Sequence, residues 1–136
     1  MQFTGIMKKY KLGYKFKSEP IKFSQQNVIE YANASGDQNP IHINKEFASK
    51  TIFKETIAHG MMIGAFLGEI IFLEYKDKWL ENGSIDIKFK APIFMNEKIQ
   101  AFAEVTNNEN QIIKLNVSVI KNDGTEAIKG YATIKI

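Results

Sequence analysis

Two histidines mark the segments of this sequence whose residue types suit acid–base chemistry. His42 ends the run Asp37-Gln38-Asn39-Pro40-Ile41-His42, and His59 precedes Gly60 at the start of the most apolar stretch. The chain has 136 residues and no cysteine. The side chains that ordinarily titrate near neutral pH are therefore these two imidazoles. Acid–base chemistry by histidine is confined to these two places.

The first segment combines a carboxylate, an amide and an imidazole in a short stretch. Asp37 and His42 could hold one water between them, with the imidazole as base and the carboxylate orienting the water or returning a proton. A structural interpretation stays open, because Asp and Asn are ordinary residues of a proline-containing turn. A metal site is less favoured, since zinc usually takes three or four protein ligands and only Asp37 and the two histidines are obvious candidates.

The second segment, His59-Gly60, suits the stabilisation of negative charge. Backbone N–H groups in the first turn of a helix have no internal partner, and the helix dipole is positive there. A glycine lets a carbonyl oxygen approach such a donor, which typically stabilises developing charge by about 3–4 kcal/mol. In the alternative interpretation, Gly60 eases entry into the helix and His59 satisfies nearby carbonyls.

The elements around the first segment follow from local signals. Ser24 is a good N-cap and Gly36 suits a left-handed C-terminal position, so we predict a helix over residues 24–35. Residues 37–43 form a loop in which Pro40 keeps Asn39 out of helical geometry. If residues 41–43 are extended within this loop, the two isoleucines face one way and His42 the other. We expect residues 45–50 to form a helical turn and residues 51–58 to be irregular.

The stretch 59–75 predicts a central buried helix, because it is apolar on nearly every side. Gly60, Gly64 and Gly68 recur every four residues along it. Each interior glycine costs about 1 kcal/mol of helix propensity relative to alanine. A compensating close approach by another backbone is therefore expected along this face.

After Gly83 the apolar period changes from helical to two, which predicts strands over residues 85–91, 99–106, 113–119 and 128–136. Residues 107–110 and 122–124 supply hairpin turns, and residues 14–23 form an earlier short strand. Consecutive strands with short links predict an antiparallel sheet. The expected fold is a single α+β domain over residues 1–136, with the sheet curved around the helix and open edges that suit a homodimer.

Composition disfavours several classes of protein. The net charge is +3 and every basic residue is lysine, so bidentate guanidinium contacts to nucleic acid are excluded. The lysines are scattered among acidic residues, which argues against nucleic acid as a partner. Residues 1–12 lack the apolar core of a secretory signal, and residues 60–75 are short for a membrane span of roughly 20 residues. We therefore expect a cytoplasmic protein without a membrane partner.

Together the motifs resemble the hydratase-2 motif of the MaoC-like family, which includes (R)-specific enoyl-CoA hydratases and related dehydratases. The resemblance is carried by the run from Ser35 through Asp37, Asn39 and His42 to Asn44, then by Phe47-Ala48 and by Ile57-Ala58-His59-Gly60-Met61. Phe89-Lys90-Ala91-Pro92-Ile93-Phe94 is similar to the family's strand and following turn. The resemblance to the family covers the chain from about residue 14 onward.

The resemblance implies a hot-dog fold, with an antiparallel sheet wrapped around a long central helix and two such units forming a dimer. It implies Asp37 and His42 as catalytic residues. Asn39 is implied to shape the site, Gly60 to bind the thioester oxygen through its N–H, and His59 to be part of the substrate-binding set. The resemblance also implies a reaction of fatty acid metabolism. This reaction is the addition of water to a 2-trans-enoyl thioester, or the reverse dehydration of an (R)-3-hydroxyacyl thioester. No metal or cofactor is implied, because the coenzyme A or acyl carrier belongs to the substrate.

One departure from the family and two other functions stay open. Some members have a serine at the position of Gly68, so any hydroxyl contact made there is missing. A thioesterase on the same fold would use Asp37 to direct water at the carbonyl carbon and would release free thiol. A non-catalytic acyl-thioester binding module would bind the ligand without turnover.

Overall fold

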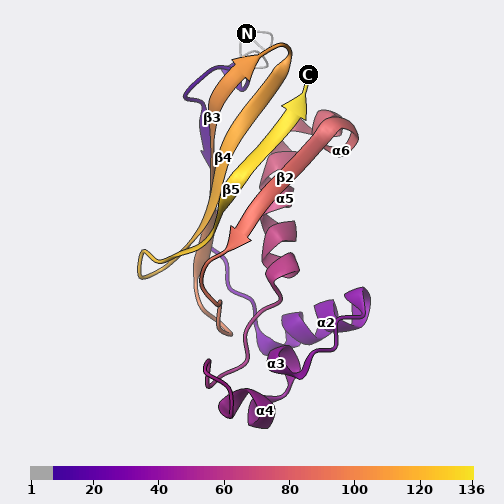
Figure 1. Cartoon of the computed structure of the whole chain (residues 1–136), viewed down its shortest axis with the longest axis vertical. Helices are drawn as coiled ribbons and strands as arrows, with labels where there is room; N and C mark the ends of the chain where they lie inside the picture. The colour runs from indigo at the N-terminus through magenta and orange to yellow at the C-terminus, as the bar shows by residue number, and fades with distance from the viewer. Residues whose placement is uncertain (1–7) are drawn as a thin grey trace.

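The computed structural model describes residues 8–136 and shows a five-stranded antiparallel sheet curved around helix α5 (Gly60–Tyr75) (Figure 1). The predicted α+β hot-dog architecture is confirmed. The strands are β1 (Lys15–Lys17), β2 (Gly83–Phe89), β3 (Ile99–Glu109), β4 (Ile112–Lys121) and β5 (Glu126–Lys135). In Figure 1 helices α2 to α4 lie beyond the end at which α5 begins, and the C-terminus lies at the other end.

The core lies between α5 and the concave face of the sheet. Alternate residues of β3, from Ile99 to Val105, are buried against it, as the period of two predicts. The prediction of a fully buried helix is correct for one side of α5 only. Met61 is 64% exposed and Leu73 is 56% exposed, because the sheet of one chain cannot surround the helix.

The strand order β1-β3-β4-β5-β2 corrects the predicted succession of neighbours. Strands β3, β4 and β5 follow one another, but β2 pairs with β5 at one edge and β1 pairs with β3 at the other. Residues 90–98 must therefore cross the end of the sheet to connect β2 to β3. Apolar alternation identifies strands without naming their partners, which is why the predicted succession of neighbours differs from the observed order.

The β3–β4 turn also lies later than predicted. It is centred on Asn110 and Gln111, whose φ values of 55° and 61° suit a two-residue hairpin turn. A register shift between Val105 and Asn107 keeps the asparagine-rich stretch 107–109 paired with β4. The turn predicted within residues 122–124 is confirmed.

Helix α2 (Gln25–Ser35) has the predicted ends: Ser24 caps it in a capping box, and Gly36 is left-handed with φ 82°. The predicted loop over residues 37–43 is wrong in its second half, because residues 40–43 form the short helix α3 (Pro40–Ile43) and are not extended. Pro40 presets the first helical residue, and the Asn39 side chain caps the new turn. The helical turn predicted next is α4 (Lys45–Ser49).

The glycines of α5 approach side chains rather than another backbone, which corrects the expectation. A Cβ at Gly60 would lie 2.9 Å from the Phe89 ring, and one at Gly64 would lie 3.3 Å from Cδ1 of Ile87. Both side chains come from β2. At Gly68, apart from the chain neighbours and the backbone of α5 itself, no atom of residues 8–136 lies within 4 Å of a Cβ position. Gly60 and Gly64 thus allow strand β2 to pack closely against α5, whereas the position of Gly68 faces open space.

Helix α6 (Asp77–Asn82) connects α5 to β2. Between residues 8 and 136, no helix combines the length and apolarity needed to cross a membrane.

Candidate active site

The two histidines meet at the amino end of α5. His42 comes from α3 and His59 is the N-cap of α5, and their rings stack with centroids 3.9 Å apart and an interplanar angle of 24°. Asp37, from the turn between α2 and α3, joins them, and its carboxylate lies 4.0 Å from Nε2 of His42. The fold therefore brings together the two segments that the sequence singled out.

A single hydrogen bond fixes the orientation of the His42 ring. Its Nδ1 lies 2.7 Å from the backbone carbonyl of Ile57. Because a carbonyl only accepts, Nδ1 carries the proton and Nε2 of the neutral ring keeps its lone pair. That lone pair lies on the side of Asp37, so His42 is oriented as a base toward the carboxylate.

The surroundings of His42 favour its neutral form. Burial lowers the pKa of His42 below its usual value, and the neighbouring His59 ring lowers this pKa further. The hydrogen bond to Ile57 and the negative charge of Asp37 act in the opposite direction without reversing the shift. At neutral pH the Nε2 atom is consequently free to accept a proton.

Residues outside the predicted set hold α3 in place. The amide of Gln25 donates to the backbone carbonyl of His42 at 2.8 Å and accepts from the buried hydroxyl of Thr56 at 2.7 Å. The backbone N–H of Ile57 donates to the carbonyl of Ile41 at 3.2 Å. Gln25, Thr56 and Ile57 were missed because their partners are distant in sequence, and no spacing indicates such pairs.

A cavity of about 490 Å³ opens at the Asp37–His42 pair. Gly60 and Met61, at the start of α5, form one part of its wall, and the strand end and crossing segment from Phe89 to Ile93 form another. The N–H of Ala58 donates to the carbonyl of Ile93 at 2.8 Å and ties the two parts together. The lining is mainly apolar, so the cavity suits a hydrophobic ligand with its polar end at the pair.

The other two predicted site residues, Asn39 and His59, do not line the cavity. The Asn39 side chain accepts from the N–H of Ile41 at 3.1 Å, and the Asn39 N–H donates to Oδ1 of Asp37 at 3.2 Å. His59 is 1% exposed, and its Nε2–H donates to the backbone carbonyl of Asp37 at 2.9 Å. Neither residue is among those that line the cavity.

The ligating atoms of Asp37, His42 and His59 all lie within 4.8 Å of one another, so the residue types would suit a metal ion. The geometry suits it less well. In-plane lone pairs of two rings stacked at 24° run in nearly parallel planes rather than toward one ion. The cluster is better arranged for proton transfer than for ligation.

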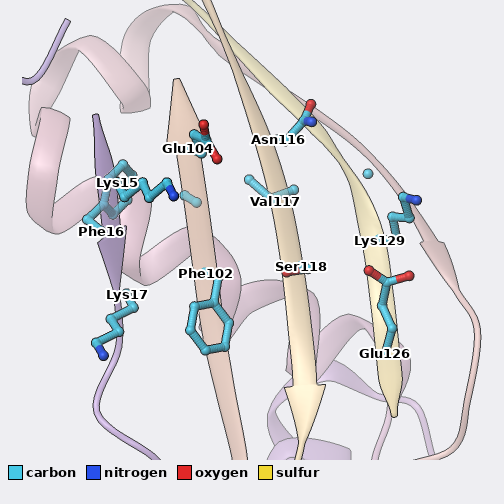
Figure 2. Close-up of a pocket in the computed structure, with 12 residues that line it drawn as sticks. Lys15, Phe16, Lys17, Phe102, Glu104, Asn116, Val117, Ser118, Glu126 and Lys129 are labelled. Atoms are coloured by element: carbon cyan, nitrogen blue, oxygen red, sulfur yellow. The ribbon is translucent and has the colours of Figure 1, made fainter. Parts of the chain in front are cut away.

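A second hollow lies on the sheet face turned away from α5 (Figure 2). Lys15 and Lys17 of β1, Phe102 and Glu104 of β3, and Lys129 of β5 line it. No histidine is among its lining residues. Acid–base chemistry by histidine therefore belongs to the cavity at the beginning of α5.

Comparison with known proteins gives this site a family. Residues 8–127 match the family model described as the MaoC like domain. The chain belongs to the MaoC-like family. A relative named (R)-specific enoyl-CoA hydratase from Aeromonas caviae is 29% identical over 121 residues, which cover 85% of this chain and 87% of that protein. A mitochondrial 3-hydroxyacyl-[acyl-carrier-protein] dehydratase from Arabidopsis thaliana is 28% identical, with 82% of this chain and 69% of that protein covered.

Solved MaoC-like structures share the fold. The (R)-hydratase from A. caviae involved in PHA biosynthesis superposes with a TM-score of 0.81 at 25% identity, covering 93% of this chain and 96% of that chain. A chain of the ChsH1–ChsH2 complex from Mycobacterium tuberculosis reaches the same TM-score at 12% identity, which shows the fold alone.

Proposed function

We propose that this MaoC-like protein catalyses the (R)-specific addition of water to 2-trans-enoyl-CoA, and the reverse dehydration of (R)-3-hydroxyacyl thioesters. The proposal rests on the Asp37–His42 pair, which lines an apolar cavity together with Gly60. Hydratase and dehydratase relatives from several organisms support the same reaction class.

The spacing of the pair suits one water molecule. A separation of 4.0 Å between Nε2 of His42 and Oδ2 of Asp37 is too long for a direct hydrogen bond. A water about 2.8 Å from each atom would bridge them. His42 takes a proton from this water while its oxygen adds to Cβ of the substrate. The pair returns one proton to Cα, so water is added overall and the enzyme regains its starting state.

Besides the catalytic pair, the reaction needs a hydrogen-bond donor for the thioester oxygen, and we assign this donor to the backbone of Gly60. Addition at Cβ moves electron density onto the thioester oxygen, which becomes enolate-like. We propose that the Gly60 N–H donates to this oxygen, which its position at the positive end of α5 and in the cavity lining supports. Asn39 contributes by capping α3 and by binding the Asp37 carboxylate through its N–H. No metal or further cofactor takes part in these steps.

We also propose that the chain acts as a homodimer. Strand β2 pairs with β5 on one side, and its other side is a free sheet edge. Phe89 on this strand is 53% exposed and Ile85 is 39% exposed, near the exposed Met61 side of α5. A second copy would cover this edge and these apolar side chains together.

Hydration of crotonyl-CoA tests the proposed function. The loss of the enoyl absorbance measures the rate, and chiral analysis identifies the product. We expect His42→Ala and Asp37→Asn each to lower kcat at least about 100-fold, the scale of general acid–base catalysis. Asp77→Asn removes an exposed carboxylate on α6 and serves as the matched control. Free thiol release without hydration would indicate a thioesterase, and binding without turnover would indicate a binding module; either result would overturn the proposal.

A further inference from the structure

We infer that His59 is a positioning residue, which holds the Asp37 backbone and the His42 ring in the arrangement that activates water and does not contact the substrate. This inference rests on the proposed hydratase function. It differs from the role in substrate binding that the sequence resemblance implies for His59.

The burial of His59 separates it from the substrate. The residue is 1% exposed and is absent from the cavity lining, although the adjacent Gly60 and the stacked His42 both line it. Its Nε2–H is committed to the carbonyl of Asp37. The remaining nitrogen, Nδ1, is buried without a hydrogen-bond partner. A side chain that bound substrate would need a free polar atom at the cavity surface, and His59 has none there.

The contacts of His59 reach both members of the catalytic pair. Through Nε2 it holds the backbone of Asp37, whose own side chain is 53% exposed and so has little packing to restrain it. Through its ring it forms the surface on which His42 stacks. The same ring contacts Tyr31 of α2, with centroids 4.8 Å apart. His59 thereby connects α2, the Asp37 turn and α3 to the first residue of α5.

Holding this geometry matters because the bridging water requires a fixed separation. The Nε2–Oδ2 distance of 4.0 Å accommodates one water, whereas a carboxylate displaced by 1 Å or more would lose one of its two contacts. Misplacement on this scale costs rates of about 100-fold even when the displaced group is chemically intact. The loss should fall on kcat, because substrate affinity depends on the cavity wall.

The charges around His42 give a second, independent readout. The titratable groups that face the two rings are Asp37 and Tyr31, while Lys90 on the opposite cavity wall is paired with Glu126 at 3.1 Å. His59 lowers the pKa of His42, and this effect is larger than the opposing effect of Asp37. Replacing His59 with a side chain that cannot take up a proton should therefore raise the pKa of His42.

Two variants separate the donor from the ring. His59→Phe keeps an aromatic surface for His42 but removes the N–H. His59→Gln keeps an N–H at the same reach but removes the ring. We expect His59→Phe to lower kcat for crotonyl-CoA about 10- to 100-fold with KM within about twofold, and His59→Gln to recover part of this loss. Tyr131→Phe, a change of polar to apolar ring on β5, should leave kcat unchanged.

The pKa is measured without any turnover. The chain has two histidines, so His59→Phe and His59→Gln each leave one imidazole whose NMR titration belongs to His42. We expect its pKa to rise in both variants relative to the wild type. An unchanged kcat and an unchanged pKa would overturn the inference, as would a raised KM with an unchanged kcat, the signature of a substrate contact. If His59→Phe does not fold, His59→Gln decides by the same criteria. Failure of the wild type to hydrate enoyl-CoA would refute the proposed function and leave the pKa test standing.

Discussion

At the scale of single residues, the chemistry depends on how each ring nitrogen is used. The Nδ1 atom of His42 is committed to Ile57, which leaves Nε2 as the base. The Nε2 atom of His59 is committed to the Asp37 backbone, which leaves that ring no part in the cavity. Hydrogen bonds to two backbone carbonyls thus leave different atoms free on two identical side chains, and the different roles that we propose for them rest on this difference.

The lowered pKa of His42 predicts a specific pH dependence. Hydration requires neutral His42, so activity falls as the pH drops through the pKa of this group, which lies below its usual value of 6.5. We expect the acid limb of kcat/KM to have its midpoint below pH 6.5. A profile of kcat/KM for crotonyl-CoA measures this limb. A midpoint above pH 6.5 would contradict the lowered pKa of the buried His42 ring.

At the scale of elements, the start of α5 and the end of β2 form the site together. Gly60 admits the Phe89 ring, and the crossing segment after Phe89 supplies the opposite cavity wall. The site therefore depends on β2 lying next to α5. This placement follows from the pairing of β2 with β5 rather than with β3.

Substitution of a glycine of α5 by alanine should have opposite effects at two positions, a loss of activity at Gly60 and a gain of stability at Gly68. Gly60→Ala places a Cβ 2.9 Å from the Phe89 ring and beside the N–H that binds the thioester oxygen. We expect at least about a tenfold loss of kcat, since a single such donor is typically worth several kcal/mol in the transition state. Crotonyl-CoA kinetics measure it. Wild-type kcat in this variant would refute the role of the Gly60 N–H.

Gly68→Ala is the matched variant in the same helix. No atom lies within 4 Å of the added methyl group, and alanine gains up to about 1 kcal/mol of helix propensity over glycine. We expect the free energy of unfolding to rise by about 0.5–1 kcal/mol, measured by urea denaturation. A destabilised Gly68→Ala protein would show that another chain fills this space.

At the scale of the whole molecule, one chain leaves its sheet edge and one side of its central helix uncovered. The homodimer proposed above predicts that a charge on β2 separates the subunits. We expect Ile85→Lys to shift the sedimentation coefficient from dimer to monomer and to lower activity, because β2 also borders the cavity through Phe89. Ile112→Lys, at a similarly exposed position on β4, should remain dimeric. A wild-type protein that sediments as a monomer at micromolar concentration would refute the dimer.

The sequence by itself determined the elements and the chemistry they carry. The cap at Ser24, the left-handed Gly36 and the helix that begins at Gly60 depend on local backbone preferences, which a local pattern records. The Asp37–His42 pair was also readable, because both residues belong to one short segment and one recognisable motif.

Only the tertiary structure decided the strand order, the partners of the α5 glycines and the division of labour between the histidines. Each depends on contacts between segments distant in the chain: β2 with β5, Gly60 with Phe89, and His59 with the Asp37 carbonyl. Even the turn of helix at residues 40–43 was missed, because Pro40 excludes helix from the residue before it and favours helix after it. Local preferences set what each segment can form, and packing between segments selects which atoms meet.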